Sequence, residues 1–255
     1  MILLSIFGCK TITIKDTKRI EGNVLFKNLL SSSEALKQVS IATSVMISGN
    51  KQIPPLYIKL NIAADLENKE ALLNFSVLSK PLFDIVYNPE KLVLINHTNT
   101  EYIEFSAEDV QIGDFIGLNF NPIDLCYLLT GNVPYSDDLN LVEFIKKENN
   151  NLDINITNTT TNFFLSFNND DKISVAKVEN QFFDPLKIST LSFTKDAKGG
   201  NIPLKIKVSS EGIKTYMTFL IRSFNYDTLI KEDYEKKIPT TYKKLTDVRD
   251  IKIQY

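Results

Sequence analysis

The side chains best suited to chemistry are few in this chain. Its 255 residues include one histidine, His97, and two cysteines, Cys9 and Cys126. A zinc site of the usual type needs more His and Cys ligands than this, and a Ser-His-Asp triad would have to use His97 as its base. His97 stands in the polar run Asn-His-Thr-Asn of residues 96–99, which predicts a solvent-exposed turn. The sequence therefore predicts no enzyme, no catalytic residues, no metal site and no cofactor.

Cys9 is the residue with a definite chemical role. It follows the apolar residues 1–8 (MILLSIFG), with Gly8 directly before it and Ile6 three positions upstream. A small residue before a cysteine is typical of a bacterial lipobox, where cleavage leaves the thiol and the new amine for acylation. More than one acyl chain anchors a protein stably to a membrane. We predict a short lipoprotein signal segment over 1–8 and lipidation of Cys9; the alternative is an apolar strand that ends in a cysteine.

Charge and hydropathy exclude several classes of protein. The chain carries 29 Lys and Arg against 31 Asp and Glu, a net charge of −2. Binding to nucleic acid needs a basic surface, so we expect no nucleic-acid partner. No apolar run approaches the roughly 20 residues of a membrane-spanning helix. Residues 9–22 are charged and polar after Cys9, and are interpreted as the lipidated cysteine and its tether.

Period-two alternation of apolar residues dominates the rest of the chain. It predicts antiparallel strands with one apolar face, at 40–48, 55–65, 71–79, 83–88, 91–96, 101–105, 153–158, 162–168, 172–179, 186–194, 202–209 and 213–222. Helices are expected at 23–38 and within a helical insert at 106–147. In this insert Asn121 as N-cap, Pro122 at the first position and Gly131 past the end define a short helix. Residues 138–147 are predicted as another helix. The fold class is therefore mainly β, in a single domain.

The insert is unusually apolar. Residues 115–134 (FIGLNFNPIDLCYLLTGNVP) are apolar on nearly every side of a helix, and such a helix must be covered all round. Cys126 lies in this stretch and is expected as a buried core thiol. A β-sheet wrapped around an apolar helical plug describes a container for an apolar ligand with a lid.

Two segments resemble the LolA/LolB family of lipoprotein carriers, most closely its outer-membrane receptor LolB. Leu78 to Asn96 (LSKPLFDIVYNPEKLVLIN) matches a strand, a loop and two following strands of LolB, and Pro122 to Pro134 (PIDLCYLLTGNVP) matches its lid helix. Between them, Thr98 to Asp109 matches a Tyr-containing strand that leads into a helix. The resemblance covers residues 23–225 and leaves 226–255 as a C-terminal extension.

The resemblance implies a fold and a function. The fold would be an incomplete antiparallel β-barrel with a helical lid, and the protein would bind the acyl chains of lipoproteins or lipids and deliver them to the outer membrane without chemistry. It implies a membrane-contact loop at Leu82 and Phe83. The residues of the cavity and lid would be Phe75, Ile85, Ile123, Leu125, Leu128 and Leu129. The implied partner is a LolA-like periplasmic carrier, and we expect a monomer anchored by lipid in the outer membrane of a Gram-negative-type envelope, facing the periplasm.

Three hypotheses therefore differ in what they predict. A carrier predicts a dry cavity behind the lid helix. An envelope lipoprotein that uses the same fold as an interaction scaffold predicts a filled core. A hydrolase predicts a polar cluster around His97 or a serine in a strained elbow, and it ranks last because the sequence has no Gly-x-Ser-x-Gly motif.

Overall fold

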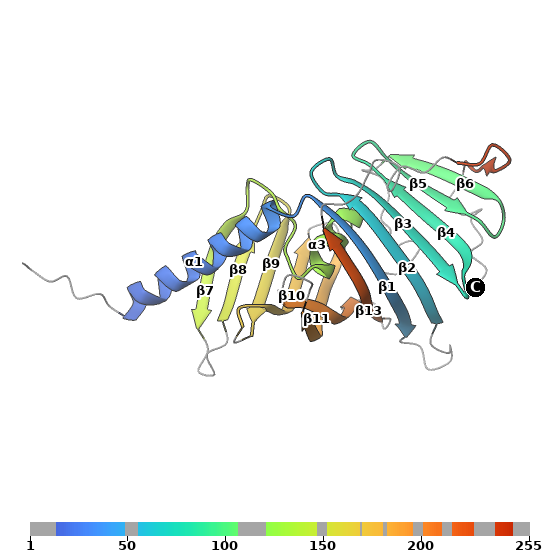
Figure 1. Ribbon diagram of the computed structural model, residues 1–255. Helices are drawn as coiled ribbons and strands as arrows, with labels where there is room; N and C mark the ends of the chain where they lie inside the picture. The colour runs from blue at the N-terminus through green and yellow to red at the C-terminus, as the bar shows by residue number, and fades with distance from the viewer. Residues whose placement is uncertain are drawn as a thin grey trace, which may run out of the picture.

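A single open β-sheet organises the chain. The structure, a computed structural model, describes residues 14–48, 56–106, 121–146, 152–168, 170–180, 183–195, 201–210, 216–226 and 238–246. These residues form a sheet of 14 strands in the order β14-β6-β5-β4-β3-β2-β1-β13-β12-β11-β10-β9-β8-β7. The two end strands do not pair, so the sheet is not a closed barrel (Figure 1). The predicted mainly β fold is confirmed.

The first half of the sheet is an antiparallel meander preceded by a long helix. The helix is α1, Ile14–Glu34. The strands that follow are β1 (Gln38–Ser48), β2 (Leu56–Asp65), β3 (Glu70–Val77), β4 (Lys80–Tyr87), β5 (Lys91–Asn96) and β6 (Glu101–Ser106). Each of these strands pairs with the next one along the chain.

The second half repeats this plan. A short helix, α3 (Pro122–Leu129), precedes it. Its strands are β7 (Asn140–Lys146), β8 (Leu152–Thr157), β9 (Thr161–Phe167), β10 (Ile173–Asn180), β11 (Phe183–Lys195), β12 (Asn201–Ser210) and β13 (Tyr216–Tyr226). β13 returns to pair with β1 and joins the two halves. The two-residue strand β14 (Lys243–Lys244) then pairs in parallel with β6.

Both halves contribute alternate residues to one hydrophobic core. Ile41 and Val45 of β1 and Phe163 and Leu165 of β9 are all nearly inaccessible and belong to the same cluster. Because successive side chains of a strand point to opposite faces, this parity defines a core face and an outer face of the sheet. The sequence alternation predicted this arrangement for β1 to β6 and β8 to β13.

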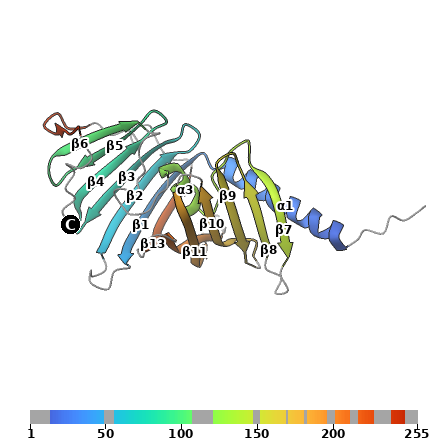
Figure 2. The ribbon, with the colours of Figure 1, turned by 180° about the vertical axis from the view of Figure 1, so that it is seen from behind.

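The two described helices, α1 and α3, lie on the core face. α1 runs beside β7 (Figures 1 and 2), and α3 packs nearest to β2 and β3. Gly22 lets α1 approach closely, because a Cβ there would lie 2.5 Å from Cγ of Phe144 in β7. No helix in the described ranges is both long and apolar enough to cross a bilayer.

Three predicted elements are placed differently by the structure. Residues 140–146 form the strand β7, so the helix predicted at 138–147 is wrong, and the helical insert of 106–147 is helical only at α3 among its described residues. α1 begins at Ile14, so 14–22 is helical where a tether was expected. Residues 1–13, with Cys9, and 107–120 lie outside the described residues.

The predicted loop at Leu82 and Phe83 is the third difference. β4 begins at Lys80, and Val77 pairs with Lys80, so the turn between β3 and β4 consists of Leu78 and Ser79 alone. Phe83 therefore lies inside the strand.

Candidate ligand-binding face

Helix α3 is fixed by local signals that the sequence carries. The side-chain oxygen of Asn121 accepts a hydrogen bond from the amide of Ile123 at 2.8 Å, and Pro122 occupies the first turn, where its missing N–H costs nothing. After the helix, Gly131 adopts φ +77°, a conformation that glycine reaches without strain. The predicted caps of this helix are confirmed.

Polar contacts at both ends hold α3 across the sheet. Nδ2 of Asn121 donates to the hydroxyl of Tyr87 in β4 at 2.9 Å. At the other end, Ser32 of α1 donates to Oδ1 of Asn132 at 2.8 Å. Gly131 packs against the ring of Pro203 in β12, 3.1 Å from where its Cβ would be. The helix is thus tied to both halves of the sheet and to α1.

The body of α3 is buried on nearly all sides. Leu125 is 2% exposed, Cys126 0% and Leu129 1%, while Leu128 is half-buried. Burial raises the pKa of the Cys126 thiol far above its ordinary value, so this thiol stays protonated and unreactive. Cys126 is a buried, free core thiol, as predicted.

The residues predicted to line the cavity come together. Phe75, Ile85, Ile123, Leu125 and Leu129 belong to one cluster of buried side chains. Leu128 packs against this cluster from the helix. The alternation in β3 and β4 and the apolar helix were sufficient to place these residues on one face.

Asp124 is the one acidic side chain of α3. It stands in the first turn of the helix, half-buried, in a helix that is otherwise apolar. Burial raises its pKa to about 6, an effect that the charge of Lys69 only partly offsets. At neutral pH the carboxylate is therefore charged in surroundings that favour its neutral form, which weakens the docking of α3.

The turn between β3 and β4 carries an exposed apolar residue. Leu78 is 93% exposed, and both turn residues have positive φ, +49° for Leu78 and +67° for Ser79. Turns of this kind favour Asn and Gly, and a bulky side chain is strained there. Phe83, by contrast, is 3% exposed and stacks on Phe75 with ring centroids 4.3 Å apart. Leu82 packs against the core.

The outer face of β3 to β5 carries a chain of polar groups around His97. Nε2 of His97 lies 2.6 Å from Oδ2 of Asp84, and Oδ1 of Asp84 accepts from Nδ2 of Asn74 at 2.7 Å. Nδ1 of His97 lies 2.9 Å from the hydroxyl of Tyr242. The side chains of His97 and Asp84 are only 11% and 2% exposed, so the predicted exposed histidine is wrong. The backbone amide of His97 bonds to the oxygen of Leu82, and this extension of the strand pairing lays the ring over Asp84.

This polar chain bears directly on the hydrolase hypothesis. An Asp-His pair is the base-and-orienter part of a triad. Here, however, the second ring nitrogen of His97 is occupied by Tyr242, and no described serine or cysteine bonds to the ring. His97 joins the neighbouring strands β4 and β5 to Tyr242, 145 residues further along the chain, which indicates a structural role. The signal that could have found it is Asp84, a single acid within the apolar strand run LFDIVY.

No metal-binding group of three or more His, Cys, Asp or Glu side chains occurs among the described residues. The candidate site is the apolar core face under α3, where the helix packs against buried side chains of the sheet.

Comparison with known proteins identifies solved structures of similar fold. No family model and no curated protein matches the sequence. Among solved structures, a LolA superfamily protein from Nitrosomonas europaea aligns with 82% of this chain and 97% of its own at a TM-score of 0.60 and 8% identity. A domain from Vibrio parahaemolyticus, provisionally described as outer membrane lipoprotein-sorting, aligns with 84% and 96% at 0.62 and 9% identity.

A third structure belongs to a differently described family. A DUF1329 family protein from Desulfovibrio piger aligns with 85% of this chain and 96% of its own, at a TM-score of 0.61 and 10% identity. At these identities the likeness concerns the fold. The chain is similar in fold to LolA superfamily and lipoprotein-sorting structures over almost their whole length.

Proposed function

We propose that this protein is an envelope carrier that binds the acyl chains of lipoproteins or lipids on the core face beneath α3 and helps to deliver them to the outer membrane. The observation that carries the proposal is α3 itself, an apolar helix held across the middle of an open apolar sheet by contacts at its ends. The fold similarity to LolA superfamily and lipoprotein-sorting structures supports the same interpretation. No chemical step is needed.

The physical requirement is to shield hydrocarbon from water. Each exposed CH₂ group costs about 0.8 kcal/mol, so a lipid with long chains does not cross an aqueous space alone. If α3 moves away, Phe75 and Ile85 offer an apolar surface in its place. The described hydrogen bonds to be broken are those from Asn121 and Ser32 at the ends of the helix, and the ligand must replace the apolar packing of Leu125 and Leu129.

The charge of Asp124 favours such a movement. With a pKa raised to about 6, this side chain is ionised at neutral pH and gains hydration when α3 leaves the core face. Apolar contacts thus hold α3 on the core face, while the charge of Asp124 weakens this packing. A ligand that supplies comparable apolar contact can therefore displace the helix.

Membrane contact is proposed at Leu78 instead of Leu82 and Phe83. Leu78 is the residue at the hairpin tip, it is almost fully exposed, and it is held in a strained conformation. A strained apolar residue at such a tip is consistent with a functional role. The anchor would be the lipid on Cys9, with the carrier on the periplasmic side of the outer membrane as a monomer that receives cargo from a LolA-like partner.

An interaction scaffold without carrier activity is the second candidate. The close burial of Leu125, Cys126 and Leu129 favours it, because it leaves the residues beneath α3 already covered. The two candidates differ in whether α3 can be displaced, which is open to experiment.

Native mass spectrometry of residues 10–255 with a synthetic triacylated lipopeptide tests the proposal. We expect stoichiometric binding that Leu128→Glu abolishes, because a charge there would face the acyl chains. Val24→Glu, at a side chain that is 52% exposed on α1, is the matched control and should bind like the wild type. Circular dichroism verifies the fold of both variants. Absence of binding by the folded wild-type protein would contradict the carrier and favour the scaffold.

A separate experiment tests the tip. Leu78→Asn retains the turn, since Asn tolerates positive φ, but removes the apolar side chain. We expect acyl-chain binding to be unchanged and transfer of the lipopeptide to vesicles to slow about ten-fold. Transfer at the wild-type rate would exclude Leu78 as the membrane contact.

A further inference from the structure

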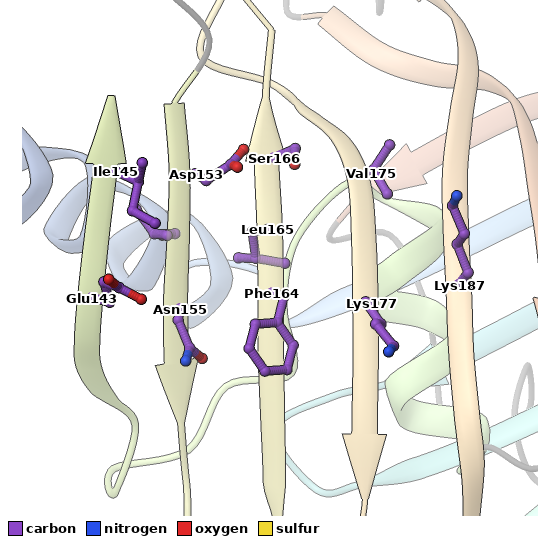
Figure 3. A pocket seen from close by; sticks show the side chains of 11 residues that line it. Glu143, Ile145, Asp153, Asn155, Phe164, Leu165, Ser166, Val175, Lys177 and Lys187 are labelled. Atoms are coloured by element: carbon purple, nitrogen blue, oxygen red, sulfur yellow. The ribbon is translucent and has the colours of Figure 1, made fainter. Parts of the chain in front are cut away.

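The outer face of the second half of the sheet contains a hollow that the carrier function does not use. It lies across β7 to β11, on the face opposite α1 and α3, with a volume of about 360 Å³ (Figure 3). This is within the usual range for sites that bind small ligands. Among the residues that line it are Glu143, Ile145, Asn155, Phe164, Lys177 and Lys187.

Strand register arranges five of these side chains in one straight row. Glu143 of β7 pairs with Asn155 of β8, and Asn155 pairs with Phe164 of β9. Phe164 pairs in turn with Lys177 of β10, and Lys177 with Lys187 of β11. Read across the sheet, the row is acid, amide, aromatic, base, base. Neighbouring strands are about 4.8 Å apart, so the row is about 19 Å long.

The charges of the row are separated by sign and incompletely neutralised. Lys177 forms an ion pair with Glu179 at 2.9 Å. Neither Glu143 at one end nor Lys187 at the other has an ion pair within the part of the chain that the structure describes. The two lysines occupy paired positions on adjacent strands, and Figure 3 shows their side chains extending in opposite directions along those strands. An anion placed between the two strands would be attracted by both charges.

The centre of the row combines apolar surface with an unused hydrogen-bond acceptor. Phe164 is 39% exposed and Ile145, in the adjacent row, is 47% exposed. Oδ1 of Asn155 is buried and accepts no hydrogen bond. Figure 3 shows the Asn155 side chain extending along its own strand beside the Phe164 ring, with its oxygen on the side of the ring. A buried acceptor without a donor costs about 1–3 kcal/mol, and a ligand N–H placed over Phe164 would remove this cost.

We propose that the hollow binds a short peptide with free termini, extended across the strands. Its ammonium group would lie at Glu143 and its carboxylate between Lys177 and Lys187. A backbone N–H would donate to Oδ1 of Asn155, and an apolar side chain would cover Phe164. An extended chain spans about 3.3–3.6 Å per residue, so five residues match a row of about 19 Å. Charge complementarity at both ends selects such a peptide over a neutral apolar ligand.

Titration of the ¹⁵N-labelled full chain with the peptide Ala-Ala-Leu-Ala-Ala tests this proposal. We expect amide shifts confined to β7–β11 and saturable binding. Lys187→Gln should weaken the free peptide about three-fold, as expected for the loss of an exposed ion pair, and leave its C-terminally amidated form unaffected. Glu143→Gln should weaken the free peptide similarly and leave the N-acetylated form unaffected. Lys59→Gln, which removes an exposed lysine from β2, is the matched control and should change nothing.

Each alternative outcome overturns the proposal. Equal affinity for the free and doubly capped peptides would exclude recognition of the termini. Shifts located outside β7–β11, or no shifts at millimolar peptide, would exclude the hollow as the site. An equal loss on Lys59→Gln would indicate general attraction to a charged surface.

Discussion

The two halves of the sheet share one core but differ on their outer faces. In β5 of the first half both parities are buried, so that Val93 and Ile95 on the outer face are 3% and 0% exposed. In the second half, the outer face exposes Phe164 at 39%, and Leu191 in β11 is 53% exposed. The outer face is therefore covered at β5 in the first half, whereas β9 and β11 of the second half expose large apolar side chains on it.

The outermost long strands of the two halves, β6 and β7, also differ in whether another segment pairs with them. Beyond β6, the amide of Leu245 donates to the oxygen of Tyr102 at 2.8 Å, and Lys244 forms an ion pair with Glu104. β7, at the other end, has no described strand beyond it, and a bulge at Val142 interrupts its pairing with β8. An unpaired edge with a bulge resists strand addition. The edge of the first half is thus sealed by the C-terminal segment along β6, whereas β7 has no described strand beside it at the edge of the second half.

The largest expected effect separates the outer faces directly. Ile95→Ala removes a fully buried side chain from the covered face and should lower the free energy of unfolding by about 2–5 kcal/mol. Leu191→Ala removes an exposed side chain from the second half and should change the free energy of unfolding by less than about 0.5 kcal/mol. Urea unfolding followed by circular dichroism measures both. Similar losses for the two variants would mean that the outer faces do not differ in burial as described.

A smaller effect concerns α3, which connects the halves. The pKa of Asp124 is raised from 3.8 to about 6 in the folded protein, chiefly by burial. Between these values the folded state binds a proton that the unfolded state releases, so stability rises as pH falls from 7 toward 4. At about 1.4 kcal/mol per pKa unit, Asp124→Asn should stabilise the protein by about 3 kcal/mol at pH 7 and by much less at pH 4. Urea unfolding of the wild type and of Asp124→Asn at both pH values measures this difference. An equal gain in stability at pH 7 and pH 4 would show that the pKa of Asp124 is not raised by folding.

Local patterns were enough to predict most of this architecture. Alternation identified the strands of the meanders, and Asn121, Pro122 and Gly131 bounded α3. The error at 138–147 also has a local cause. The bulge at Val142 brings Leu141 and Phe144 to the core side with a spacing of three residues, which imitates the period of a helix.

The hairpin tip and the polar chain were not predictable in the same way. Leu78 and Ser79 lack the Gly or Asn that signals a two-residue turn, so Pro81 suggested the loop instead. Asn74, Asp84 and His97 meet only through strand register, and Tyr242 reaches them from a segment beyond the last long strand. The row of the outer hollow likewise depends on register across five strands, which no short window of sequence contains.

The smallest expected effect tests how the first half is sealed. Tyr242→Phe keeps the ring that lies edge-on to His97, with centroids 5.8 Å apart, but removes the hydroxyl that bonds to Nδ1. A lost hydrogen bond of this kind costs about 1 kcal/mol, or about five-fold in local opening. The amides of Lys243 and Leu245, which bond to the oxygens of Thr100 and Tyr102, should then exchange about five-fold faster with solvent deuterium.

The matched control for this prediction is Tyr57→Phe, which removes a hydroxyl from a side chain that is 65% exposed on β2. It should leave the exchange of both amides unchanged, because it touches no contact of the C-terminal segment. Unchanged exchange in Tyr242→Phe itself would show that Leu245, which packs into the core, and the Lys244–Glu104 pair suffice to hold the segment. Faster exchange in Tyr242→Phe alone would instead show that the polar chain around His97 helps to hold the C-terminal segment along β6, and so to seal the edge that has no counterpart at β7.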